Sequence, residues 1–134
     1  MIHHVCRAAW KPEATQEQKE AALESWRNQG RTIPVVKSFL VGNDLGGEYD
    51  HSAIFSVEDL DALFEYLTHP TTYETDNLGM HLLDRLEIFD ISDDDDPDLY
   101  SKIEALQLRR NEHNPAIAKK LTELPTYLGA GLEK

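Results

Sequence analysis

The chain has 134 residues, of which 40% are hydrophobic and 28% charged, and 13 Lys and Arg against 25 Asp and Glu give a formal net charge of −12. This length predicts one domain. The negative charge repels polyphosphates and anionic lipids, so we expect no nucleic-acid or membrane partner. Because there is no long apolar run, no signal-like start and only one cysteine, Cys6, we predict a soluble cytoplasmic protein.

The first expected element is a strand over residues 2–10, ended by Lys11 and Pro12. Neither of its two faces is fully polar, which is typical of a strand that is covered on both sides. One face carries Ile2, His4, Cys6, Ala8 and Trp10, and the other His3, Val5, Arg7 and Ala9. A helix follows, with a capping box at Thr15 and Gln18 and an expected end near Gly30.

Two further strands are expected over residues 33–42 and 49–57, with a turn between them. The second of these strands alternates cleanly, so its side chains divide into two faces. Tyr49, His51, Ala53, Phe55 and Val57 share one face, opposite Asp50, Ser52, Ile54 and Ser56.

Apolar residues at helical spacing predict a helix over residues 60–67 that ends before Pro70. A second capping box, Thr71 with Glu74, predicts a helix to about Asp84, and residues 85–91 form a last strand. The order β-α-β-β-α-α-β predicts an α+β protein, a ferredoxin-like plait. Its four-stranded antiparallel sheet is expected to carry the helices on one face.

The composition changes at the acidic run 92–98, which we interpret as a solvated linker. Apolar residues then predict two helices within residues 98–124 that dock on the body or on a partner protomer, whereas residues 125–134 are expected to be irregular. We therefore divide the chain into a domain of residues 1–91 and an extension of residues 92–134.

The segments IHHV, WKP, IPVVKSFLVGNDL, YDHSAIF, THP and LEIFDI, in this order, resemble the stress-responsive A/B barrel (Dabb) family over residues 1–91. The resemblance implies a homodimer in which two sheets pack face to face into a dimeric α/β barrel. The dimer face would carry Val5, Arg7, Asp50, Ser52, Ile54 and Ser56, and an ion pair between Arg7 and Asp50 is expected there.

The family is similar to olivetolic acid cyclase-type proteins, and that plant enzyme closes a ring in a linear polyketide without metal or cofactor. The resemblance implies a pocket between sheet and helices in each protomer. Its pocket histidines fall on His4 and His51, its tyrosine on Tyr66 and its aromatic residue on Trp26. The family's catalytic histidine falls on Thr72, so any base role passes to His51, His4 or bound water.

His4 and His51 lie on the helix-facing side of two strands that we expect to be adjacent and parallel, where their rings would meet. A buried neutral imidazole is suited to acid–base work near pH 7, and Tyr66 would donate a hydrogen bond to a developing oxyanion. The same residues could instead only fill the core. The candidate catalytic residues are thus His51, His4 and Tyr66, and the candidate substrate-binding residues are Trp26, Phe55, Phe64, Thr72, Leu83 and Ile88.

Three functions remain open: a cofactor-free cyclase or isomerase of a small apolar carbonyl compound, a non-catalytic stress or ligand-binding homodimer, and, by fold analogy, a cofactor-free monooxygenase. A pocket of about 300 Å³ beside His51 would favour the enzymes. No metal site is expected, because the histidines lack ligand spacing. Cys6 is either a nucleophile paired with His4 or a small buried hydrophobic residue.

Overall fold

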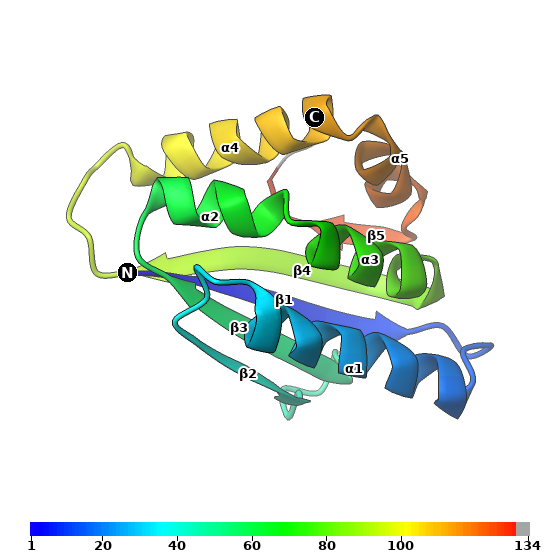
Figure 1. Cartoon of the computed structure of the whole chain (residues 1–134). Helices are drawn as coiled ribbons and strands as arrows, with labels where there is room; N and C mark the ends of the chain where they lie inside the picture. Colours follow the sequence, from blue (N-terminus) through cyan, green and yellow to red (C-terminus); the bar gives the residue numbers. More distant parts are fainter. Residues whose placement is uncertain (131–134) are drawn as a thin grey trace.

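The computed structural model of the protein describes residues 1–130, and in it every helix lies on one face of a single sheet (Figure 1). The elements in chain order are β1 (Ile2–Trp10), α1 (Gln16–Thr32), β2 (Ser38–Asn43), β3 (His51–Val57), α2 (Leu60–Leu67), α3 (Pro70–Gly79), the 3₁₀ turn η1 (Met80–Leu82), β4 (Leu83–Ser92), α4 (Leu99–His113), α5 (Pro115–Glu123) and β5 (Thr126–Leu128). The predicted ferredoxin-like plait with a helical C-terminal extension is confirmed.

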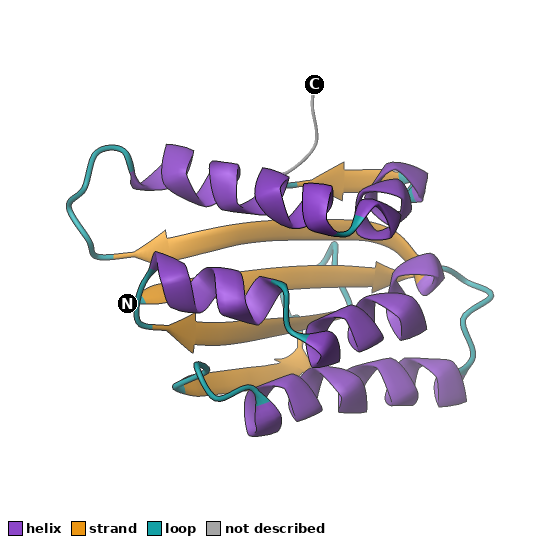
Figure 2. Ribbon diagram, turned by 45° about the horizontal axis from the view of Figure 1, so that its top comes forward, coloured by secondary structure: helices purple, strands orange, loops and turns teal. Residues whose placement is uncertain are grey.

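The sheet has five strands in the order β2-β3-β1-β4-β5, not the four expected (Figure 2). The first four are antiparallel neighbours, and β5 adds to the edge in parallel with β4. The prediction of an irregular segment over 125–134 was therefore wrong for residues 126–128. They satisfy backbone groups of β4 that an open edge would leave unpaired.

The prediction that the first and third strands run parallel was also wrong, since β1 and β3 are antiparallel. The physical reason is the order of the connections. A helical crossover returns the chain in the same direction, so β2 runs parallel to β1, and the β2–β3 hairpin then reverses the chain. This reversal decides which residues of the two central strands meet.

Several element boundaries differ from the prediction. The second strand begins at Ser38 rather than residue 33. The helix expected from Thr71 to Asp84 ends at Gly79, followed by η1 and by β4 from Leu83. Its N-cap is His69, not Thr71, because the His69 Nδ1 accepts the Thr71 N–H at 3.1 Å and Pro70 occupies the first helical turn.

The C-terminal helices belong to the core. In the elements that cover the sheet, α4 packs against α2, while α5 packs against η1 and α4. Ile103 of α4 joins the cluster around Phe55, and Ile117 and Leu121 of α5 join a second cluster around Leu86. The two helices predicted within residues 98–124 are present and docked on the body, where they close the layer above β1 and β4.

Within residues 1–130, no helix lies on the opposite face of the sheet. Register places four apolar residues in one row across the strands, Leu40, Ile54, Val5 and Phe89. Arg7 lies in the next row and pairs with Asp44 at 2.8 Å, not with Asp50 as expected. Asp50 instead accepts the Trp10 backbone N–H at 3.0 Å, because it precedes β3 and lies beside the end of β1.

Candidate functional site

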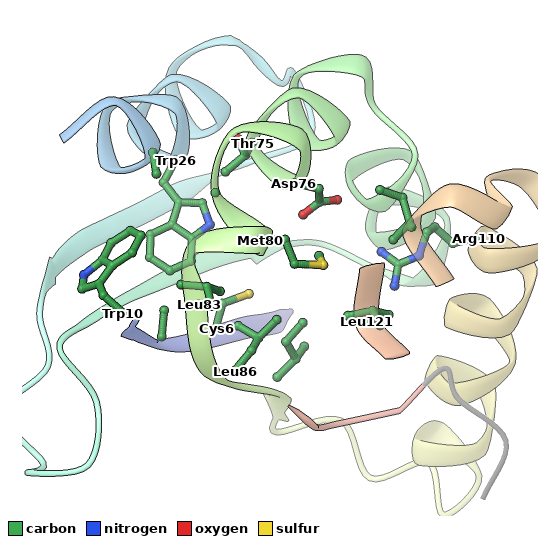
Figure 3. Close-up of a pocket in the computed structure, with 15 residues that line it drawn as sticks. Cys6, Trp10, Trp26, Thr75, Asp76, Met80, Leu83, Leu86, Arg110 and Leu121 are labelled. Atoms are coloured by element: carbon green, nitrogen blue, oxygen red, sulfur yellow. The ribbon is translucent and has the colours of Figure 1, made fainter. Parts of the chain in front are cut away.

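A cavity of about 80 Å³ lies between the helix-covered face of the sheet and helices α1, α3, α4 and α5 (Figure 3). A smaller cavity of about 40 Å³ adjoins it. The two share the walls Cys6, Trp26, Asp76, Ile88 and Arg110. The rest of the larger cavity is mostly apolar, with Ala8, Trp10, Ala22, Met80, Leu83, Leu86, Ile117 and Leu121. Such a mostly apolar space with a few polar groups has the features of a small-molecule site.

Asp76, near the end of α3, is the carboxylate of this cavity. Its side chain forms no hydrogen bond and no ion pair with any residue of the described part, 1–130. Burial raises the pKa of Asp76 to about 7, against the opposing effect of the cations Arg110, Lys120 and His4. A carboxyl group that titrates near neutral pH is suited to take up and release protons there.

Arg110, on the inner face of α4, is the second charged group of the cavity and is only 5% exposed. Its Nε donates to Asn111 Oδ1 at 2.8 Å, while its two terminal nitrogens have no acceptor among residues 1–130. Figure 3 shows the guanidinium group pointing into the cavity on the side that faces Asp76. The two groups do not form an ion pair, so the cavity holds two unpaired charged side chains.

His4 lies in the wall of the smaller cavity and is 2% exposed. Its Nδ1 is 2.8 Å from Asp90 Oδ1, and Cys6 lies on the same face of β1, two residues further on. Burial would lower the pKa of His4, but the charges of Cys6 and Asp90 and their hydrogen bonds raise it to about 10. The expectation of a neutral imidazole base considered burial alone, and these charges act against the effect of burial. The Asp90 carboxylate therefore favours the charged form of the ring.

Tyr66 of α2 lies beside His4, with ring centroids 5.6 Å apart. Its hydroxyl donates to Gln29 Oε1 at 2.6 Å, and Gln29 in turn donates to Thr75 Oγ1. Burial raises the pKa of Tyr66 well above its usual value, so the phenol keeps its proton. Thr72 Oγ1 donates to the Tyr66 carbonyl oxygen at 2.7 Å. The structure thus brings His4, Tyr66 and Thr72 together around the smaller cavity.

His51 is not part of this group. It lies opposite Ala8, whereas His4 lies opposite Phe55. The two histidines are therefore separated by four residues along β1, which span about 13 Å. His51 Nδ1 accepts a hydrogen bond from Trp10 Nε1 at 2.9 Å and lines neither cavity. The expectation that the two rings meet failed because it assumed parallel strands.

The six residues predicted to bind substrate divide in the same way. Trp26, Leu83 and Ile88 line the larger cavity, and Thr72 lines the smaller one. Phe55 is fully buried in the core against Tyr66, and Phe64 lies under the Arg109 guanidinium at 4.1 Å from its ring centroid, so neither lines a cavity.

The sequence argument missed Asp76 and Arg110. Arg110 follows Ile103 and Gln107 at helical spacing, so a charged residue on the apolar stripe of α4 was the available signal. For Asp76 no local signal exists, because its burial depends on segments far away in sequence. Among residues 1–130 there is no cluster of three or more His, Cys, Asp and Glu side chains that would hold a metal ion. None of the helices in that range is long and apolar enough to cross a membrane.

Comparisons with known proteins agree with this fold. The family model described as "Stress Responsive A/B Barrel Domain" matches residues 2–93. A dimeric ferredoxin-like protein of unknown function from Thermobifida fusca is 22% identical, with TM-score 0.62 over 68% of this chain and 89% of its own. The Arabidopsis thaliana protein At3g17210 is 25% identical, with TM-score 0.61 over 72% of this chain and 98% of its own.

A hydroxynitrile lyase from Passiflora edulis is 14% identical, with TM-score 0.63 over 71% of this chain and 94% of its own, which indicates a shared fold. None of the curated proteins compared with the chain matches it. The family match ends at residue 93, so Arg110 and Gln107 come from the part of the chain that follows it.

Proposed function

The chain belongs to the stress responsive A/B barrel domain family, and on that premise we propose that it is a cofactor-free enzyme. The proposed reaction is a proton transfer, as in an isomerisation or an aldol-type cyclisation, on a small and largely apolar carbonyl compound. The observation that carries the proposal is the unpaired Asp76 carboxyl group in an apolar cavity, with a pKa of about 7.

Each group of the site has a role that its environment supports. Asp76 in its ionised form removes a proton from the carbon next to a carbonyl group, because its basicity is matched to neutral pH. The negative charge that develops on the carbonyl oxygen is stabilised by a buried cation, His4 or Arg110, in a site of low polarity. Tyr66 keeps its proton and orients the polar groups through Gln29.

The test is proton exchange with solvent. The protein is incubated in D₂O with a panel of small ketones and oxo acids, and deuterium uptake at the carbon next to the carbonyl is followed by NMR. Asp76→Asn should lower the exchange rate by about a hundredfold or more, the usual effect of losing a general base. The matched control is Asp84→Asn, which removes an exposed carboxylate of β4. Equal rates with and without protein for the whole panel would refute the proposal.

The second candidate is a non-catalytic ligand-binding protein. The cavity of about 80 Å³ favours it, since pockets for drug-sized molecules usually have about 300 Å³ or more. In addition, His4 and Tyr66 already have the partners Asp90 and Gln29. Binding of a panel compound without deuterium exchange would support this candidate, and oxygen uptake during turnover would instead support a monooxygenase.

We also propose that the protein is a homodimer formed through the open face of the sheet. The neighbour from Thermobifida fusca is a dimeric protein, and the row Leu40, Ile54, Val5 and Phe89 is an apolar stripe that a second sheet would cover. Leu40 is 64% exposed in the single chain. Light scattering at micromolar concentration should give about 31 kDa, twice the 15.3 kDa of one chain.

A further inference from the structure

We infer that the cavity binds a small monocarboxylic acid, whose carboxylate is held by the terminal nitrogens of Arg110 from α4. This inference rests on the proposed function, in that the acid is the substrate of the same site. It names the substrate class and assigns its recognition to α4, which lies beyond the family match of residues 2–93.

The first argument is the unpaired cation. The Arg110 side chain is buried, with only 5% of its surface exposed. Its terminal N–H groups have no acceptor among residues 1–130. A buried cation without a partner is costly, so an anion that enters the cavity is strongly favoured there. The planar guanidinium fork matches the two oxygens of a carboxylate. Because Nε is already held by Asn111, the two terminal nitrogens are fixed in direction.

The second argument is a further polar atom that has no partner. Gln107 Oε1 is completely buried and has no hydrogen-bond partner within residues 1–130. Gln107 lies one helical turn before Arg110 on the same face of α4, and both line the smaller cavity. Gln107 Oε1 can accept a hydrogen bond, and the Arg110 guanidinium group can bind a carboxylate. Together they suit an acid that also carries a hydrogen-bond donor, such as a hydroxyl group.

The third argument concerns Asp76 and the walls. In its protonated form Asp76 donates a hydrogen bond to an anion, whereas in its ionised form it repels one. The charged groups that face it are Arg110 of α4, Lys120 of α5 and His4 of β1, and the Tyr66 and Tyr73 phenols lie nearby. The pKa of Asp76, about 7, places its change of charge near neutral pH, and the Cys6 thiol also lines both cavities. Since the walls are aromatic and aliphatic, the body of the acid is a short hydrocarbon.

Ligand binding in the larger cavity can be followed by tryptophan fluorescence. The chain contains two tryptophans, Trp10 and Trp26, and both line the larger cavity. Binding is therefore measured by quenching of the tryptophan fluorescence of the full chain. The probes are isobutyrate and benzoate, their neutral counterparts isobutyramide and benzamide, and inorganic phosphate, each titrated at about pH 6 and about pH 8.5.

Arg110→Met removes the charge and keeps an unbranched side chain, and Arg110→Lys keeps the charge without the fork. Arg109→Met is the matched control, because Arg109 is exposed and stacks on Phe64 outside the cavity. We expect the carboxylates to bind at least about tenfold more tightly than the amides, this preference to vanish in Arg110→Met, and Arg110→Lys to be intermediate. Binding should weaken at the higher pH, and Asp76→Asn should lose that dependence.

The inference is overturned if the amides bind as tightly as the carboxylates, if Arg110→Met and Arg109→Met both retain the wild-type preference, or if phosphate binds more tightly than either acid. The deuterium exchange test gives an independent result. Carboxylates that bind without any exchange would refute the proposed function and leave the ligand class standing. Exchange that is equally fast with neutral ketones and with oxo acids would support the function and refute the ligand class.

Discussion

The Asp76 carboxyl group should make the stability of the protein depend on pH in one direction. Its pKa is 3.8 in the unfolded chain and about 7 in the folded protein, because burial in the cavity disfavours the charged form. Between these values the folded protein keeps a proton that the unfolded chain has lost. The stability associated with this proton is fully present below pH 3.8 and is lost as the pH rises to about 7.

The size of the effect follows from the shift. Three pKa units at about 1.4 kcal/mol each give roughly 4 kcal/mol between the two ends of this range. This figure is an upper bound, since the carboxyl group keeps partial contact with solvent. Asp76→Asn mimics the protonated acid at every pH. The variant should therefore match the wild type at acidic pH and exceed its stability by up to roughly 4 kcal/mol above pH 7.

Urea unfolding of both proteins at one fixed protein concentration, repeated from about pH 4 to about pH 8.5, measures this difference. The contribution of His4 to the stability of the protein also falls with rising pH, but between pH 6.5 and about 10. Because both proteins contain His4, the difference between them reports on Asp76. Asp84→Asn is the control with an exposed carboxylate. A difference between Asp76→Asn and wild type that stays constant across this range would refute the reasoning, because it would show that the carboxyl group is ordinarily solvated.

Three further predictions test other parts of the structure. Asp90→Asn removes the carboxylate that faces His4, so the pKa of His4, followed by NMR of the ring protons, should fall from about 10; an unchanged value would exclude the ion pair. Leu40→Asp places a charge in the apolar row of the open sheet face, and light scattering should then give the 15.3 kDa monomer; a persistent dimer would show another interface. Tyr66→Phe should slow deuterium exchange by about tenfold to ten-thousandfold, whereas His51→Ala, which changes a residue outside both cavities, should leave it unchanged; the reverse pattern would restore His51 to the site.

Much of the fold follows from local patterns. Alternation along residues 2–10 and 51–57 predicts which side chains face the helices, because neighbouring residues of a strand point to opposite faces whatever the strand pairs with. Helical spacing likewise predicts α2, α4 and α5, since the apolar stripe of a helix depends on residues within two turns. These patterns, with the resemblance to one family, are sufficient to predict the plait and a cavity between its sheet and helices.

The chemistry of that cavity depends on segments that are distant in sequence. Asp76 lies in α3 and Arg110 in α4, 34 positions later, and only the packing of both helices over β1 brings them to one space. The same holds for His4, whose charge depends on Asp90 of β4, and for β5, which needs the open edge of β4. The sequence by itself determined the faces of the elements, because periodicity is local. Tertiary structure decided strand direction, the partners of His4 and His51, and the protonation of Asp76, because pairing and burial are properties of the whole packed chain.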